Sequence, residues 1–354
     1  MKGLILSGGK GTRLRPITYT SAKQLIPIAN KPVLFYVLED VSRAGIKDVG
    51  IIVGDSAKEI MDAVGDGQKW NLNITYIQQN EPLGLAHTVM ISEKFLRGSP
   101  FVMYLGDNLL KEGISSFVNN FDSSQAQAMI LLAEVNNPQE FGVAELKNGK
   151  VVRLIEKPQN PPSNYALVGI YLFTDIIFDA VKQLKPSWRN EYEITDAIQY
   201  LIDKGFTVEP HIVKSYWKDT GKLEDILEAN RLILEDIASD IQGSIDEKST
   251  IIGKVCIGTG AKIISSTIRG PAIIGENAYI KNSFIGPFTS IGNATQIINS
   301  EIENSILMSH SKIIRLRKRI EDSLIGKGVE IKRETKPPKA YRFMIGDHSQ
   351  IGIY

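Results

Sequence analysis

The feature that most constrains this chain is a repeat of aliphatic residues in its last third. Isoleucine recurs every six positions, and each set of three begins 17 residues after the previous set. The repeated positions are Ile251, Ile257 and Ile263, then Ile268, Ile274 and Ile280, then Ile285, Ile291 and Ile297, and then Ile302. Such a fixed period is typical of a parallel β-helix, in which three short strands make one coil and the aliphatic side chains stack inward.

A basic segment, Arg315–Arg319, interrupts this repeat. We expect it to form a loop that leaves the solenoid, and we expect coils to resume at Leu324-Ile325-Gly326, Ile345-Gly346 and Ile351-Gly352. Binding of nucleic acid by the basic segment is the weaker alternative. The chain has 41 basic and 40 acidic residues and a formal net charge of +1, so no global field attracts nucleic acid or an anionic membrane.

The first two thirds of the chain alternate between strand-like and helix-like patterns. Apolar runs of strand length lie at Leu4–Leu6, Val49–Val53, Ile74–Ile77, Phe101–Leu105 and Met129–Ala133, and helical spacing covers Val33–Ala44, Ala86–Leu96 and Lys222–Ala238. This alternation predicts an α/β domain with a Rossmann-like, mostly parallel sheet. We place this domain at residues 1–240 and the β-helix domain at residues 241–354.

A glycine-rich loop, Gly8-Gly9-Lys10-Gly11-Thr12-Arg13-Leu14, follows the first strand-like run. Glycines at the end of a strand let backbone N–H groups approach phosphate oxygens closely, and Arg13 adds a permanent cation suited to phosphate. Lys23 supplies a second cation nearby in sequence. The spacing is neither that of a Walker loop nor that of the dinucleotide fingerprint. The loop therefore predicts a phosphate site of another kind.

Together with Pro16, Pro27 and Lys31-Pro32, this loop resembles the opening signature of the sugar-phosphate nucleotidyltransferases. Within that family the chain is similar to the long glucose-1-phosphate thymidylyltransferases, which end in a left-handed β-helix. The resemblance implies Mg²⁺-dependent transfer of a nucleotidyl group from dTTP to glucose 1-phosphate, with release of pyrophosphate. It implies nucleotide binding by Leu6, Gly8, Gly9, Gly11, Thr12, Arg13, Gln79, Gly84 and Asp107.

The resemblance also implies that Asp107 and Asp219 hold one Mg²⁺. Asp107 follows a buried strand, and carboxylates at such strand ends face the ligand crevice of an open α/β sheet. Mg²⁺ takes few protein carboxylates and completes its shell with water and substrate phosphates. We expect Trp217 to pack beside the second aspartate.

The family uses residues at the positions of Gln79 and Gly84 to read a pyrimidine. A glutamine amide can donate to O4 and accept from N3–H of thymine or uracil at once. Sequence does not choose between dTTP and UTP, because one methyl group is worth roughly 1–3 kcal/mol in an apolar pocket. For His87, in the same region, we expect a packing or helix-surface role.

For the second substrate, the resemblance implies a sugar-phosphate wall of Gly142, Glu156, Lys157, Val168 and Trp217. Phe141 stands where the family more usually has tyrosine, so a hydroxyl is missing. Segment Tyr192–Asp196 either shapes this pocket or begins a helix capped by Thr195 or Asp196.

The mechanism that follows is an in-line displacement in which the sugar phosphate is already an anion and needs no general base. We expect Arg13, Lys23 and Lys157 to be catalytic, with Lys157 on the attacking phosphate and the other two on the departing pyrophosphate.

Three other expectations concern the whole chain. Its single cysteine, Cys256, fits a reducing compartment, and we expect a cytoplasmic protein without nucleic-acid or membrane partners. We expect the β-helix to support a homo-oligomer. An alternative is that the β-helix carries acyl transfer with His310 as base, which would make the chain bifunctional, and another is a non-enzymatic nucleotide-sugar-binding protein.

Overall fold

The computed structural model describes residues 1–334 and 340–353. These residues divide into two compact units, each built from three stretches of chain. The first unit contains Met1–Lys10, Ser21–Leu25 and Val33–Asp219, and the second contains Gly11–Thr20, Ile26–Pro32 and Thr220–Tyr354. The predicted domain boundary at residue 240 stays a prediction about function, because packing alone divides the chain elsewhere.

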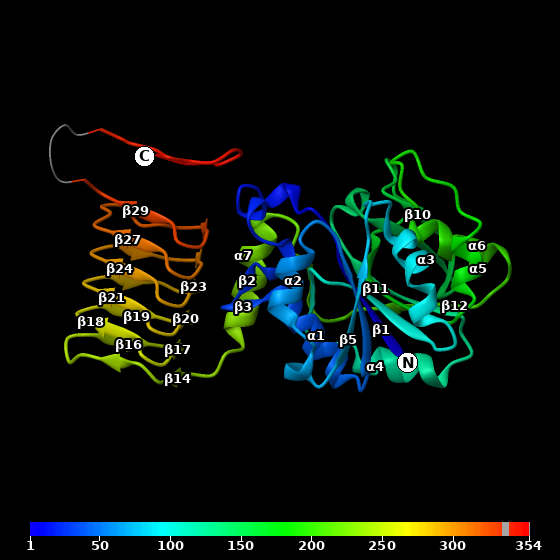
Figure 1. Cartoon of the computed structure of the whole chain (residues 1–354), viewed down its shortest axis with the longest axis horizontal. Coiled ribbons are helices and arrows are strands. Elements are labelled where there is room, and N and C mark those ends of the chain that lie inside the picture. Colours follow the sequence, from blue (N-terminus) through cyan, green and yellow to red (C-terminus); the bar gives the residue numbers. More distant parts are fainter. Residues whose placement is uncertain (335–339, 354) are drawn as a thin grey trace. The chain divides into compact units, whose positions relative to one another are not determined.

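The first unit is a mixed sheet of nine described strands with helices on both faces (Figure 1). Its strands are β1 (Lys2–Ser7), β4 (Asp48–Val53), β5 (Asn73–Gln78), β6 (Phe101–Leu105), β8 (Ala128–Glu134), β9 (Gly142–Lys147), β10 (Lys150–Glu156), β11 (Tyr165–Phe173) and β12 (Val208–Ile212). Its helices are α1 (Val33–Arg43), α2 (Ala57–Val64), α3 (Leu85–Leu96), α4 (Ser115–Ser123), α5 (Ile177–Val181) and α6 (Ile194–Asp203). The predicted strands and helices of this part are confirmed.

Strand order explains where a ligand site can form. The order β10-β9-β11-β6-β1-β4-β5 places β1 between β4 and β6, and β1 pairs parallel with both. The chain runs from β1 outward to β4 and β5 and then returns to the other side of β1 as β6. In an open α/β sheet, the carboxyl ends of strands at such a switch point form the ligand crevice.

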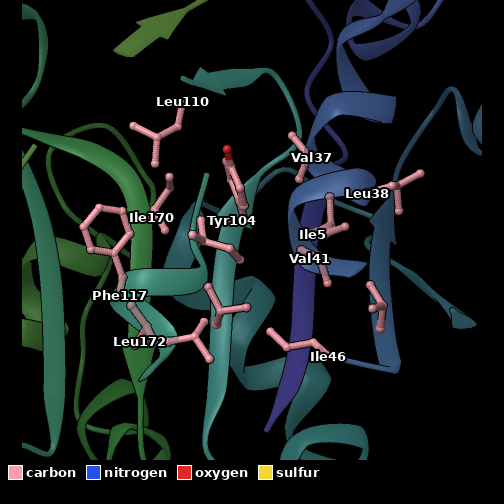
Figure 2. Close-up of a cluster of buried hydrophobic side chains, with 14 of the residues drawn as sticks. Ile5, Val37, Leu38, Val41, Ile46, Tyr104, Leu110, Phe117, Ile170 and Leu172 are labelled. Carbon is pink, nitrogen blue, oxygen red and sulfur yellow. The ribbon is translucent and has the colours of Figure 1, made fainter. Parts of the chain in front are cut away.

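Two apolar layers cover this sheet, because successive residues of a strand face opposite sides. Ile5 and Tyr104 point into one layer with Val37, Leu38 and Val41 of α1, as Figure 2 shows. Neighbouring residues of the same two strands join the opposite layer, together with helices α3, α5 and α6. Burial on both faces keeps the strand ends in fixed positions.

The second unit contains the β-helix, seen as stacked strands in Figure 1. Its three faces are the parallel sheets β14-β17-β20-β23-β26-β28, β15-β18-β21-β24-β27-β29 and β16-β19-β22-β25. The bounds are β14 (Asp240–Ile241), β15 (Ser244–Ile245), β16 (Thr250–Ile252), β17 (Val255–Ile257), β18 (Lys262–Ile264), β19 (Thr267–Arg269), β20 (Ala272–Ile274), β21 (Tyr279–Lys281), β22 (Phe284–Ile285), β23 (Thr289–Ile291), β24 (Gln296–Ile298), β25 (Glu301–Ile302), β26 (Ile306–Leu307), β27 (Lys312–Ile314), β28 (Leu324–Ile325) and β29 (Glu330–Lys332).

The repeat predicted from sequence is confirmed by strand register. Ile251 aligns with Ile268, and Ile268 with Ile285, so the isoleucines stack in the core of a left-handed parallel β-helix. Asn282 and Asn299 occupy corners with positive φ values of 48° and 49°, a region that asparagine tolerates better than most residues.

Two expectations about the end of the repeat are wrong. The basic segment does not leave the solenoid: Leu316 packs on its apolar core, and Ile320 bridges to Ile302. Arg319 forms ion pairs with Glu301 and Glu303. These acidic partners sit on the preceding coil and neutralise one of the basic residues.

The second error concerns residues 340–353, where we expected two further coils. This described stretch contains no strand, and Ile345 and Ile351 are half or more exposed, at 58% and 50%. Without neighbouring coil positions to fill a core, the Ile-Gly pairs alone do not build a coil. His310, the candidate base for acyl transfer, lies at an exposed corner with φ of 64°.

The second unit also contains the hairpin of β2 (Pro27–Ile28) and β3 (Lys31–Pro32) and the helix α7 (Leu223–Glu235). Asn230 of α7 is fully buried. Its Oδ1 accepts from the Ala29 N–H at 2.8 Å and from the Ser290 hydroxyl at 2.6 Å, and its Nδ2 donates to the Phe288 carbonyl at 2.9 Å. One side chain thus joins hairpin, helix and solenoid.

Leu14 belongs to the same unit and is buried in an apolar cluster. Its companions there are Ile26, Ile226 and Leu227, with Ile306 and Met308 from the solenoid. The residue directly after Arg13 is therefore fixed against the β-helix.

We predict that Asn230→Ala destabilises the second unit, because it leaves three buried polar groups without a partner and each such group costs roughly 1–3 kcal/mol. Calorimetric unfolding should show the loss, and Glu235→Ala, at an exposed position on the same helix, should stay within about 0.5 kcal/mol of the parent. Equal stability of Asn230→Ala and the parent would contradict the structure.

Candidate functional site

The carboxyl ends of β1 and β6 meet at the switch point of the sheet. The Gly106 N–H, just after β6, donates to the Leu6 carbonyl at 2.9 Å. A Cβ on Gly106 would lie only 2.6 Å from the Ser7 hydroxyl, so this close approach requires glycine. The two strand ends therefore bring Gly8 and Asp107 to the same edge of the sheet.

Lys23 lies between two carboxylates at this edge. Its ammonium contacts Asp107 directly and lies 3.6 Å from Oδ1 of Asp219, and its side chain is only 9% exposed. Asp219 comes from the two-stranded ribbon of β7 (Asn108–Leu110) and β13 (Trp217–Asp219), in which it pairs with Asn108. The ribbon brings together two aspartates that are more than a hundred residues apart in sequence.

The donor set fits a magnesium ion. Two carboxylates lie on one cation here, and among the described residues there is no larger cluster of His, Cys, Asp or Glu that could hold a metal. Mg²⁺ is commonly held by one or two carboxylates and keeps positions for water and phosphate oxygens. Zinc-type ligation would need a fuller set of nitrogen or sulfur donors.

The residues expected to read the base gather at the end of β5. The Gln79 N–H donates to the Val53 carbonyl at 2.9 Å, and its side chain lies against Gly8, where a Cβ would be 3.1 Å from Oε1. Gly84 has φ of 96°, and a Cβ there would lie 2.6 Å from the Tyr192 carbonyl oxygen. Gly84 is thus required by both its backbone conformation and its neighbour.

Glu156 forms the centre of a third group. Its carboxylate lies 3.3 Å from the Arg189 guanidinium and 3.4 Å from the Thr195 hydroxyl. Burial and the nearby Glu193 raise the pKa of Glu156, whereas Lys157 and Arg189 oppose this. A Cβ on Gly142 would lie 3.1 Å from Glu156 Oε2, so glycine leaves the room that this carboxylate occupies.

A cavity of about 530 Å³ opens beside Glu156 and is also lined by Ser187, Trp188, Glu193 and Gln199. The structure resolves the alternative for the segment around Thr195: α6 begins at Ile194 with Glu193 at the cap position, so Thr195 lies inside the helix and faces the pocket.

Lys157 has φ of 42°, an unusual left-handed conformation for a lysine. Its N–H donates to the Phe141 carbonyl at 3.0 Å. The Phe141 ring in turn meets the indole of Trp217 edge-on, with centroids 5.6 Å apart. The aromatic ring therefore keeps a packing role where the expected tyrosine hydroxyl is missing. The Val168 carbonyl accepts from Asn108 Nδ2 at 3.1 Å, which links this wall to the aspartate ribbon.

Most of the predicted site residues fold within the first unit, where the structure forms the three groups around Lys23, Gln79 and Glu156. Gly11, Thr12 and Arg13 fold with the second unit, and Leu6 and Gly9 belong to the first. Sequence reasoning missed Arg189, which lies in a segment with no periodic pattern, and it assigned His87 to packing. His87 instead contacts Gln79, with 3.1 Å between Nδ1 and the amide nitrogen.

Comparisons agree with this geometry. The family model described as nucleotidyl transferase matches residues 2–236, and the chain belongs to this family. The chain is 53% identical over 355 residues to the glucose-1-phosphate thymidylyltransferase of Streptomyces antibioticus, covering all of this chain and 99% of that protein. It is 47% identical to the low-salt glycan biosynthesis nucleotidyltransferase Agl11 of Haloferax volcanii, covering both chains fully.

A solved structure from Bacillus anthracis, described as a glucose-1-phosphate thymidylyltransferase in complex with a sucrose, has 34% identity and a TM-score of 0.63. The match covers 68% of this chain and 97% of that one. Every helix that our structure describes is too short or too polar to span a bilayer.

We predict that Arg189→Met raises the pKa of Glu156 further, because it removes a cation that favours the charged carboxylate. The side-chain carboxyl carbon of Glu156, followed by NMR during a pH titration, measures this directly. Arg153→Met, at an exposed position on β10, should leave that pKa unchanged. A fall in the Glu156 pKa in Arg189→Met would contradict the observed pair.

Proposed function

We propose that this protein transfers the thymidylyl group of dTTP to glucose 1-phosphate and releases pyrophosphate. The observation that carries the proposal is the Asp107–Lys23–Asp219 cluster at the switch point of the sheet. Gln79 and Glu156 add a base reader and a sugar reader in the same unit. The similarity to the Streptomyces enzyme, over the full length of both chains, supports the same reaction.

The chain's own residues would act by positioning and by neutralising charge. Lys157 holds the phosphate of the sugar, whose oxygen attacks the α-phosphorus, and no general base is needed because that oxygen is already an anion. Lys23, Arg13 and the backbone N–H groups of the glycine-rich loop hold the departing pyrophosphate.

Asp107 and Asp219 would hold one Mg²⁺, which supplies positive charge to the phosphates when bound. Two carboxylates already share one ammonium at this point, which supports their holding a cation together. The expectation of a homo-oligomer built through the β-helix remains part of the proposal, as does a cytoplasmic location. Light scattering on the purified chain would test the first.

For the sugar, Glu156 would accept hydrogen bonds from hydroxyl groups, with Gly142, Val168 and Trp217 forming the rest of the wall. Gln79 would donate to O4 of the base and accept from N3–H, which both thymine and uracil satisfy. The preference for dTTP over UTP then depends on the space left for one methyl group.

The direct test is a pyrophosphate-release assay that crosses dTTP, UTP, GTP and ATP with several sugar 1-phosphates. We expect turnover with the pyrimidine triphosphates and glucose 1-phosphate, and Asp107→Asn should lower kcat by at least about 100-fold because it removes charge from the centre of the site. Asp122→Asn, at an exposed position of the same unit, is the matched control. Absence of turnover with every pyrimidine triphosphate would refute the proposal.

The pH dependence gives a separate prediction. Because burial raises the pKa of Glu156, its carboxylate should become protonated at a higher pH than an ordinary glutamate as the pH falls. The protonated form accepts hydrogen bonds poorly, so KM for glucose 1-phosphate should rise on the acid side. Glu156→Gln should have a high KM that no longer varies over this range, and an unchanged acid limb would show that another group is responsible.

A further inference from the structure

His87, the third residue of α3, lies beside the side chain that would read the base. Its Nδ1 is 3.1 Å from Nε2 of Gln79. The other end of the amide faces Gly8, since a Cβ there would approach Oε1 to 3.1 Å. Gln79 is only 9% exposed, so few other groups can orient its amide.

The position of His87 is itself fixed. Its ring stacks near the ring of Tyr192, with centroids 6.4 Å apart and planes 26° apart. The Tyr192 backbone is held by two hydrogen bonds to this region: its N–H donates to Leu83 at 2.7 Å, and its carbonyl accepts from Ala86 at 3.0 Å. His87 is therefore a rigid neighbour of the amide.

We propose that His87 is a positioning residue for base recognition: neutral imidazole Nδ1 accepts one N–H of Gln79 and thereby prevents the amide from turning over. The inference rests on the proposed function of Gln79. An amide nitrogen that donates to His87 has one N–H left, and the carbonyl oxygen has a fixed place beside it. Burial lowers the pKa of His87 while Glu81 opposes this, which favours the neutral ring.

Fixing the amide determines which pyrimidine the site accepts. Thymine and uracil present an acceptor at position 4 and a donor at N3, whereas cytosine presents a donor at position 4 and an acceptor at N3. An amide free to rotate by 180° can satisfy either pattern. With the amide held in one orientation, cytosine would face donor against donor and acceptor against acceptor.

The test compares kcat/KM for dTTP and dCTP, each with glucose 1-phosphate, in three variants. His87→Leu and His87→Ala remove the acceptor, and His87→Asn keeps an acceptor oxygen near the position of Nδ1. We expect the dTTP-to-dCTP ratio to fall by at least about tenfold in the first two variants and to recover largely in the third. The maximal rate with saturating dTTP and KM for glucose 1-phosphate should change less than about threefold, because His87 touches neither the phosphates nor the sugar wall.

Two outcomes separate this inference from the proposed function. If Gln79→Leu leaves the ratio unchanged, Gln79 does not read the base and that part of the proposed function fails. If Gln79→Leu lowers the ratio but His87→Leu and His87→Ala keep it within twofold of the parent, only the role of His87 is overturned. The two removal variants guard against loss of folding in one of them, and thermal unfolding of each checks this.

Discussion

Two carboxylates can share a small, partly buried space only if a cation lies between them. Like charges about 4 Å apart repel by roughly 4 kcal/mol near a protein surface, and Lys23 removes that cost for Asp107 and Asp219. The rest of the first unit serves this arrangement: parallel strands bring the first aspartate to the switch point, and the β7–β13 ribbon brings the second. In the proposed reaction the same ammonium also meets phosphate oxygens, so carboxylates and pyrophosphate compete for one charge.

The base side and the sugar side of the site are not independent. Tyr192 is hydrogen-bonded to the backbone around Gly84, stacks near His87, and directly precedes Glu193, whose charge raises the pKa of Glu156. A shift of this one segment would move the neighbour of Gln79 and the surroundings of Glu156 together. The two substrates of the proposed reaction are therefore read by side chains with a common support.

Sequence predicted what periodicity and motif carry. The six-residue spacing of isoleucines predicted the solenoid, and apolar runs predicted the strands that end at the site. It could not predict Arg189 on Glu156 or His87 on Gln79, because both contacts join residues through tertiary packing with no fixed spacing. It failed at Arg315–Arg319, where charge suggested a loop but Leu316 and Ile320 fill core positions, and at Ile345 and Ile351, where the local pattern had no neighbouring coils to complete it.

Leu14 and Asn230 have a consequence for how such a chain could have arisen. Because each unit takes three stretches of chain, no single cut between residues separates them. A solenoid joined to an existing enzyme by a simple linker would leave Leu14 and the β2–β3 hairpin without the partners they have here. Loss of the solenoid by a stop codon would expose the same apolar surface. The C-terminal repeat is thus not an interchangeable module, and its gain or loss during evolution would require matched changes within the first 32 residues.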